Sequence, residues 1–356
     1  MKGIRLLTAA GLLLAGSAFA QQDIQLIGKI QQQLPRSANP MVRTLNAQAL
    51  PASITLLKIE LSDNAWMKLQ ARTEETEKKM PQNPIVGESK GVQLGMNDVP
   101  VLDQGPHSTC ATFAVTAAID AALHQGDTIS QLCQLQLGRH LEKNGYTFSG
   151  WNGSMGPIIL HQMQTFGFVS KATQREKGCA GTTEYPTYTS DEPEAELSLA
   201  DYHALSEAMP EGSVSWSSML DAYHVFVDKV DPNQTLKNVI TVLNAGDRLT
   251  FGVLLFSTEQ GIAGAIGKHH ASNDTWVLTP EIIKQINQQG EFGGHAMIIT
   301  GYDNEAVAID NQGRSHKGLL TIRNSWGSHI GNNGDFYMSY DYFKALTIEI
   351  QRIRSS

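Results

Sequence analysis

The spacing of hydrophobic positions changes along the N-terminal part of the chain. In residues 21–34 the apolar side chains lie three or four positions apart, which predicts a helix with one apolar face. These side chains are Ile24, Ile27, Ile30 and Leu34. Residues 54–61 largely alternate between apolar and polar side chains, which predicts a short strand. Residues 65–79 are charged and rich in helix-forming residues, so a second helix is expected before Pro81 and Pro84.

Further along, the pattern indicates a helical part followed by a β-rich part. Small residues dominate residues 110–124, which predicts a helix that packs closely on other structure. Residues 185–235 are acidic and rich in proline, which indicates an insertion or a segment between two lobes. Five apolar runs with the character of strands follow, at residues 249–256, 296–301, 306–310, 319–324 and 335–339. We therefore predict an α+β fold with two lobes.

The pattern of residues 1–20 is typical of a secretory signal peptide. Lys2 and Arg5 precede an apolar run at residues 6–15, and residues 18–20 (Ala-Phe-Ala) form a small-x-small cleavage pattern. The run is too short to span a bilayer, and no other apolar stretch reaches that length. We expect export to a periplasm or out of the cell, with no membrane association after cleavage. The alternative is a buried N-terminal helix.

Composition narrows the range of partners. The net charge is -8 at pH 7, and a mildly acidic chain lacks the basic surface that nucleic acids and anionic membranes require. Residues 21–90 differ from the rest because they are rich in Gln, Lys and Glu and poor in Gly. We interpret them as a separate pro-segment that inhibits the protein until it is removed. We expect the protein to be a monomer.

The three cysteines are Cys110, Cys133 and Cys179. An odd number in an exported protein leaves at least one thiol unpaired, unless it forms an intermolecular bridge. A disulfide between Cys133 and Cys179 would leave Cys110 free for chemistry; the alternative is three buried, inert thiols. Four histidines, His269, His270, His316 and His329, lie at no metal-ligand spacing, so no metal is expected.

Cys110 stands where a thiol becomes reactive. A Gly-Pro turn leads into the predicted helix, whose first residue is Cys110. The unpaired N–H groups and positive dipole end of a helix favour a thiolate and can hold an oxyanion beside it. Gln104, six positions earlier, could supply a second oxyanion donor.

A thiolate needs a base, and the base needs an orienting acceptor. His295 follows two glycines and opens an apolar strand, so a neighbouring segment can approach it closely. Asn324 ends the run at residues 319–324, and its carbonyl oxygen could orient the imidazole. Trp326 could shield that hydrogen bond from water.

These segments, in this order, resemble the papain family of cysteine peptidases. That family has Gln six residues before a catalytic Cys at a helix start, and an aromatic residue three positions after it. A His-Ala pair then opens a strand that runs to Gly-Tyr, followed by Asn-Ser-Trp-Gly and a Gly-x-Asn-Gly turn. The matching positions are Gln104, Cys110, Phe113, His295, Ala296, Gly301, Tyr302, Asn324, Ser325, Trp326, Gly327, Gly331, Asn333 and Gly334. The resemblance extends over about residues 99–345.

The resemblance implies a papain-like peptidase domain over residues 91–356, with a helical lobe at about 99–225 and a β-barrel-like lobe at about 226–356. It implies that the Cys110 thiolate attacks a peptide carbonyl, that His295 acts as base and acid, and that Asn324 orients His295. Gln104 and the Cys110 N–H would stabilise the oxyanion, without any cofactor. Peptides or proteins would be the substrates, and the implied substrate-binding residues are Gly153, Ser154, Met155, Ala296 and Trp326.

The chain also departs from the family pattern. Ala111 stands where the family has Trp, and Ser154 replaces a loop glycine. A family disulfide joins the positions occupied here by His107 and Trp151, so both of its cysteines are missing together. Tyr185-Pro186 resembles part of a family Tyr-Pro-Tyr motif. Two other functions remain open: a non-catalytic binding protein on this fold, and a thiol acyl transferase.

Overall fold

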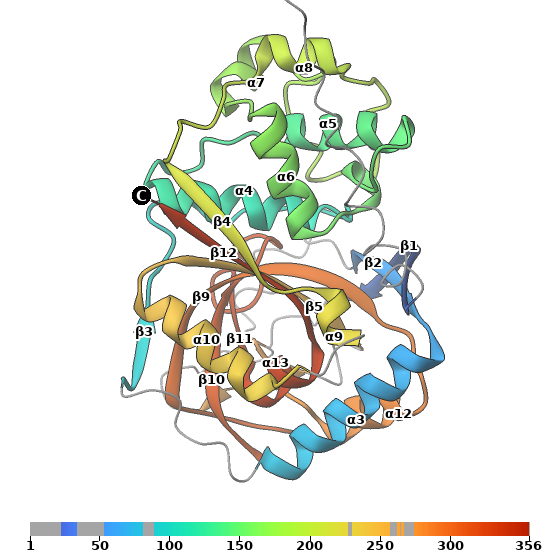
Figure 1. Cartoon of the computed structure of the whole chain (residues 1–356), viewed down its shortest axis with the longest axis vertical. Coiled ribbons are helices and arrows are strands. Elements are labelled where there is room, and N and C mark those ends of the chain that lie inside the picture. The colour runs from blue at the N-terminus through green and yellow to red at the C-terminus, as the bar shows by residue number, and fades with distance from the viewer. Residues whose placement is uncertain are drawn as a thin grey trace, which may run out of the picture.

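The computed structural model describes residues 23–33, 53–80, 89–226, 230–256, 262–263, 265–266 and 274–355. Within these ranges the molecule divides into a lobe of helices and a lobe built on a sheet, which confirms the α+β prediction (Figure 1). The predicted signal peptide and the pair His269 and His270 lie outside the described residues. No described helix combines the length and apolar character needed to cross a membrane.

The helical lobe is built around one buried helix. Its elements are α4 (Cys110–Leu123), α5 (Gln131–Lys143), the short 3-10 helix η2 (Gly150–Asn152), α6 (Gly156–Phe166), α7 (Lys171–Lys177) and α8 (Leu199–Leu205). The helix predicted at residues 110–124 is therefore confirmed as α4. Because most of its side chains are small, α4 can pack against helices α5 and α6 and also against the sheet. A disulfide joins Cys133 of α5 to Cys179, as the sequence suggested.

The other lobe is built on a twelve-stranded sheet. Its longer strands are β4 (Val214–Leu220), β5 (Arg248–Leu255), β9 (Gly293–Ile309), β10 (Ser315–Arg323), β11 (Asp335–Ser339) and β12 (Thr347–Ser355). The shorter strands are β3 (Gly91–Gln93), β6 (Ile262–Ala263), β7 (Ala265–Ile266) and β8 (Thr275–Trp276). Along the sheet the order is β4-β12-β5-β9-β10-β11-β8-β6, and β2 (Ser53–Leu61), β3 and β7 also pair with β9. Strand β9 is therefore the centre of the sheet.

The strands predicted from the second half are present, with one difference. The apolar runs at residues 296–301 and 306–310 belong to one strand, β9, and not to two. Pairing with β10 continues on both sides of the polar residues between the runs, with register shifts between Lys317 and Leu319 and between Thr321 and Ile322. Within residues 185–235, β4 pairs with β12, and the two strands cross the region between the lobes (Figure 1).

In the part of the chain that the structure describes, five helices pack in the sheet lobe: α3 (Asp63–Lys79), α9 (Ala222–Phe226), α10 (Pro232–Asn244), α12 (Pro280–Asn287) and α13 (Tyr340–Leu346). Every residue of α13 is buried, because α3 and α10 pack against it as well as the strands. The buried side chains of these helices join those of β5, β9 and β10 in the largest hydrophobic cluster of the protein. Burial of this apolar surface is the main source of stability of the lobe.

The helix predicted at residues 21–34 is wrong. Residues 24–33 form a strand, β1 (Ile24–Gln33), which pairs antiparallel with β2 (Ser53–Leu61). The strand predicted at residues 54–61 is thereby confirmed. The register shifts between Leu26 and Gly28, so Ile27 is the extra residue of a bulge and is exposed. Ile24, Leu26 and Ile30 pack against the sheet lobe, and the spacing of Ile24, Ile27 and Ile30 only imitates one face of a helix. The ladder of hydrogen bonds with β2 outweighs the local helical pattern.

Helix α3 confirms the helix predicted at residues 65–79, and it is an integral part of the sheet lobe. Trp66 packs edge-on against Phe292, with ring centroids 5.5 Å apart. The Arg72 guanidinium is buried and donates to the Thr347 carbonyl oxygen. Leu69 of α3 is only 1% exposed, so loss of α3 would remove buried side chains and uncover the residues on which they pack, such as Phe292. The boundary predicted at residue 90 remains a prediction, but the helix before it is packed as part of this lobe.

Candidate active site

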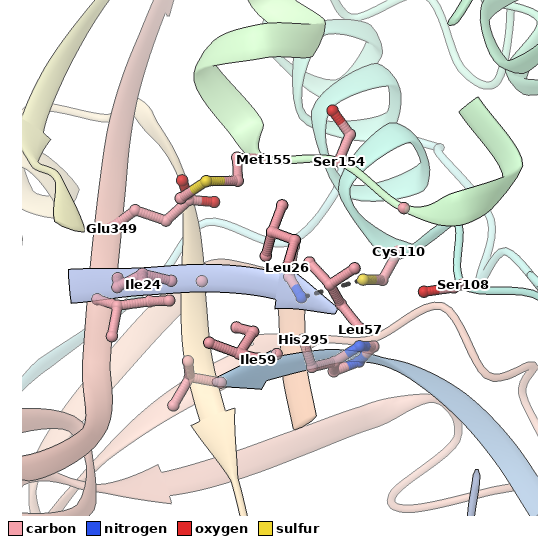
Figure 2. Close-up of a pocket in the computed structure, with 16 residues that line it drawn as sticks. Ile24, Leu26, Leu57, Ile59, Ser108, Cys110, Ser154, Met155, His295 and Glu349 are labelled. Carbon is pink, nitrogen blue, oxygen red and sulfur yellow. Dashed lines mark hydrogen bonds between the residues drawn. The ribbon is translucent and has the colours of Figure 1, made fainter. Parts of the chain in front are cut away.

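The N-terminus of α4 and strand β9 meet where the two lobes join. Cys110 is the first residue of α4, and its side chain is 5% exposed. The Ala296 N–H of β9 points at the Cys110 Sγ, at 3.4 Å. Because His295 precedes Ala296, this contact brings the imidazole to the same pocket as the thiol (Figure 2).

Antiparallel pairing of β9 with β10 brings Asn324 to His295. Arg323, the last residue of β10, pairs with Ile298, so Asn324 lies just past the strand end and near the start of β9. The His295 Nε2 and the Asn324 Oδ1 are 2.8 Å apart. Since the amide oxygen can only accept, Nε2 carries the hydrogen and Nδ1 holds the lone pair. Nδ1 is buried and has no hydrogen-bond partner among the described residues.

The indole ring of Trp326 lies over one face of the His295 imidazole. Its ring stacks on His295 with centroids 4.6 Å apart and planes 24° apart. The indole in turn contacts the rings of Trp276 and Phe336. This apolar cover keeps water away from the hydrogen bond between His295 and Asn324, in which both residues are almost fully buried.

Gln104 is buried in the loop that precedes α4. Its Nε2 donates to the His107 carbonyl oxygen at 2.7 Å, and its Oε1 accepts from the Ser325 hydroxyl at 2.7 Å. The Gln104 N–H also donates to the Ser325 carbonyl oxygen. Gln104 is thus held by two hydrogen bonds to Ser325, which directly follows Asn324. Its part as an oxyanion donor remains a prediction.

Burial favours the neutral forms of both Cys110 and His295 in this structure. It raises the pKa of the Cys110 thiol to about 11, although the N–H groups of Ala296 and Ala111 favour the thiolate. Burial also lowers the pKa of His295 to about 4, opposed by the hydrogen bond that its Nε2–H donates to Asn324. The position of Cys110 at a helix start led us to expect a thiolate. The difference arises because the site is closed to water.

The N-terminal hairpin, formed by β1 and β2, closes the site. A cavity of only about 30 Å³ remains beside Cys110 and His295. Four of the predicted binding residues line it, namely Gly153, Ser154, Met155 and Ala296. Ile24, Leu26, Leu57 and Ile59 of the hairpin line it from the other side (Figure 2). Trp326 does not line the cavity, because it lies behind His295.

Three glycines let the hairpin approach closely. Leu57 and Lys58 of β2 pair with Gly294 and Gly293, directly before His295. A Cβ atom at Gly294 would lie 2.7 Å from the Ile59 Cδ1, and one at Gly153 would lie 2.8 Å from the Leu57 Cδ1. Those distances are shorter than real carbon contacts. The backbone on both sides of the site therefore fits this hairpin.

Sequence reasoning missed Glu349, which also lines the cavity. The Gly156 N–H donates to its Oε1 at 3.1 Å, and its Oε2 has no hydrogen-bond partner among the described residues. Burial raises the pKa of Glu349 to about 7. The only local sign of Glu349 in the sequence is that a carboxylate stands between the apolar residues Ile348 and Ile350 of β12. Within the described ranges, no group of three or more His, Cys, Asp or Glu side chains is arranged to hold a metal ion.

Comparison with known proteins bears on the second half of the chain. A family model described as the Peptidase C1-like family matches residues 217–353, less than half of the chain. The matched part contains His295 and Asn324 but not Cys110. No curated protein sequence matches the chain.

Several solved structures align with the chain at low identity. Xylellain, a cysteine protease from Xylella fastidiosa, is 19% identical over 76% of this chain and 88% of its own, with a TM-score of 0.47. Bromelain from Ananas comosus is 14% identical over 75% of this chain and 100% of its own, with a TM-score of 0.43. Digestive procathepsin L 3 of Tenebrio molitor is 13% identical over 87% of this chain and 96% of its own, with a TM-score of 0.45. All three TM-scores lie below 0.5.

Proposed function

We propose that this protein is a papain-type cysteine endopeptidase, exported and made as an inactive zymogen. One observation carries the proposal. His295 is fixed by Asn324 through Nε2, and its other nitrogen is a buried, unpartnered acceptor in the pocket that holds the Cys110 thiol. A nucleophile, a base and an orienting acceptor are the set that acyl transfer to a thiol requires.

The reaction follows from these positions. Once the hairpin leaves, water reaches the site, and the proton of Cys110 moves to the Nδ1 of His295. The thiolate attacks the peptide carbonyl, and the N–H groups at the start of α4 hold the oxyanion, assisted by the Gln104 amide. His295 then gives its proton to the leaving amine. In the second step His295 takes a proton from a water molecule whose oxygen attacks the thioester carbonyl; the C–S bond breaks, the carboxylic acid leaves, and the Cys110 thiolate and protonated His295 are restored.

The hairpin accounts for the inactive form. It occupies the cleft with four aliphatic side chains and leaves no room for a peptide beside Cys110. It is anchored to both lobes, by pairing of β2 with β9 and by an ion pair between Lys29 and Glu192 at 2.6 Å. The inhibitor within residues 21–90 is then the hairpin alone, while α3 stays with the sheet lobe.

The test uses the full chain and an epoxide that alkylates active-site thiols. We expect slow labelling of Cys110, with cleavage of a peptide library that rises after the hairpin is displaced by Leu57→Asp. Cys110→Ala should lose both labelling and cleavage, and His295→Ala should lose cleavage. Ile27→Asp is the matched control, because Ile27 lies on the same hairpin and is 47% exposed.

The same experiment separates the alternatives. Labelling of Cys110 without hydrolysis, but with transfer of the acyl group to an added amine, would establish a thiol acyl transferase. Absence of both labelling and cleavage in the Leu57→Asp chain would contradict the peptidase and favour a binding protein.

A further inference from the structure

A cluster of aromatic side chains lies directly behind the loop that holds Gln104 and Cys110; His107, Trp151 and Tyr185 form it, and Phe113 of α4 contacts Tyr185 at 5.0 Å. His107 and Trp151 contact each other edge-to-face, with ring centroids 5.2 Å apart. Tyr185 stacks on Trp151 at 5.6 Å with planes 13° apart, and it also meets His107 edge-to-face. His107 and Trp151 are almost fully buried, at 2% and 1% exposed. We call His107, Trp151 and Tyr185 the aromatic brace.

Tyr185 connects the brace to both ends of the loop. Its hydroxyl donates to the Gln104 carbonyl oxygen at 2.8 Å. Since that uses its single proton, the hydroxyl of Thr109, 2.9 Å away, donates to the Tyr185 oxygen. Thr109 directly precedes Cys110 and is the N-cap of α4. One hydroxyl therefore fixes the loop at the residue before the turn and at the residue before the nucleophile.

The rest of the loop is held to the same segment. His107 Nε2 donates to the Pro186 carbonyl oxygen at 2.9 Å. Gly105 has a φ of 57°, and a Cβ there would collide with the Thr187 backbone. On the opposite side of the cluster, Trp151 Nε1 donates to Gln136 Oε1 at 3.1 Å. The brace is thus hydrogen-bonded to α5 through Gln136 and to the start of α4 through Thr109.

Trp151 also connects the brace to the other wall of the pocket. It lies in η2, which leads into Gly153, Ser154 and Met155, all lining the cavity. Neither His107 nor Trp151 is a cysteine, so the link between this wall and the Cys110 loop is held by ring contacts and hydrogen bonds alone. The disulfide of the lobe, between Cys133 and Cys179, does not include either segment.

We propose that the aromatic brace is a non-covalent positioning device for the reaction, with Tyr185 as its central positioning residue. Resting on the proposed function, it sets the distance between the oxyanion donors at the start of α4 and the wall formed by residues 153–155. Burial raises the pKa of Tyr185, so its hydroxyl keeps its proton and remains a donor through the working range of pH. The brace touches no substrate. It acts through Gln104, Thr109 and the turn between them.

The decisive variant is Tyr185→Phe, which keeps the ring contacts and removes only the two hydrogen bonds of the hydroxyl. It is made in the full chain that carries Leu57→Ala to open the site. Displacement of oxyanion donors by a fraction of an ångström to about 1 Å lowers the rate by about 10- to 100-fold. We expect kcat to fall by that factor, with KM and the thermal unfolding midpoint close to those of the parent. Tyr188→Phe is the matched control, because Tyr188 is 84% exposed in the same loop.

A second pair of variants tests the ring stack. Trp151→Phe retains a ring against Tyr185 and should keep most of kcat, whereas Trp151→Ala should lose kcat as Tyr185→Phe does. Because Trp151→Ala also removes a ring that is 1% exposed, kcat is compared per folded molecule, below the unfolding midpoints of both variants. Loss of kcat in the Ala variant alone, among folded molecules, is a result that simple destabilisation would not give.

Failure of this inference can be distinguished from failure of the proposed function. If the parent cleaves peptides but Tyr185→Phe and Tyr188→Phe have equal kcat, the brace is ordinary core packing and this inference is wrong. A Tyr185→Phe chain that loses kcat only in proportion to its folded fraction would overturn it as well. If the parent neither labels at Cys110 nor cleaves, the proposed function fails and this inference fails with it.

Discussion

Leu57→Ala tests the closed state of the protein at the point where the hairpin meets the site. Leu57 is 5% exposed, pairs with Gly294 and packs over Gly153. Removing most of its side chain deletes apolar contact that exists only while the hairpin is docked. Full burial of a leucine side chain is worth about 1.5–3 kcal/mol. A loss of about 2 kcal/mol raises the open fraction about 30-fold, because each 1.4 kcal/mol is a factor of ten.

The assay is the rate at which an epoxide thiol reagent adds to Cys110, followed by intact mass. When opening and closing are faster than alkylation, this rate is proportional to the open fraction. We expect it to rise about 30-fold in Leu57→Ala. It should remain unchanged in Ile27→Ala, on the outer side of the same hairpin. Equal rates in Leu57→Ala and the parent, or the same increase in both variants, would refute the docking argument.

Three further predictions concern the base, helix α3 and the buried carboxyl. Asn324→Ala removes the acceptor of the buried His295 N–H; a loss of about 1–3 kcal/mol predicts a 5- to 150-fold fall in kcat/KM, measured with a peptide substrate. Trp66→Ala should lower the free energy of unfolding in urea by about 3–5 kcal/mol, whereas Met67→Ala, 61% exposed on the same helix, should change it little; an unchanged Trp66→Ala would mean that α3 is not part of the lobe. Glu349 has a folded pKa raised to about 7, so the stability it contributes is present below its ordinary pKa and is lost as pH rises through 7. Glu349→Gln should therefore become more stable relative to the parent between about pH 4.5 and 7, and a difference that is constant with pH would contradict this.

The sequence predicted those parts of the site that lie at the boundaries of elements. Cys110 opens α4 and Asn324 follows the last residue of β10, and both positions follow from the local pattern of small, apolar and polar residues. The strand over residues 54–61 was predicted by its alternation, and it is β2. The meeting of His295 with Asn324 depends on the register of β9 with β10, which no local pattern contains. The resemblance to a family supplied that pairing.

What the sequence could not give depends on contacts between distant segments. The helical spacing at residues 24–33 is misleading because a bulge at Ile27 shifts the alternation of a strand. Occlusion of Cys110 by Leu57 and Ile59 follows from docking of the hairpin, and it reverses the expected protonation of the thiol. Glu349 gave no strong local signal, because Gly156, which donates to its carboxylate, lies 193 positions away. Tyr185 was noticed only as part of a motif, because its hydrogen bond to Gln104 spans 81 positions.

The central claim is that Cys110 forms an acyl bond with the substrate carbonyl and that His295 assists. The most direct measurement is rapid acid quenching of the Leu57→Asp chain during turnover of an activated ester of a short peptide, followed by mass mapping of the digested protein. We predict an added acyl mass on the peptide that contains Cys110, lost in Cys110→Ala and accumulating more slowly in His295→Ala. Turnover of the ester with no acyl group on Cys110, or with the acyl group on another residue, would contradict the claim.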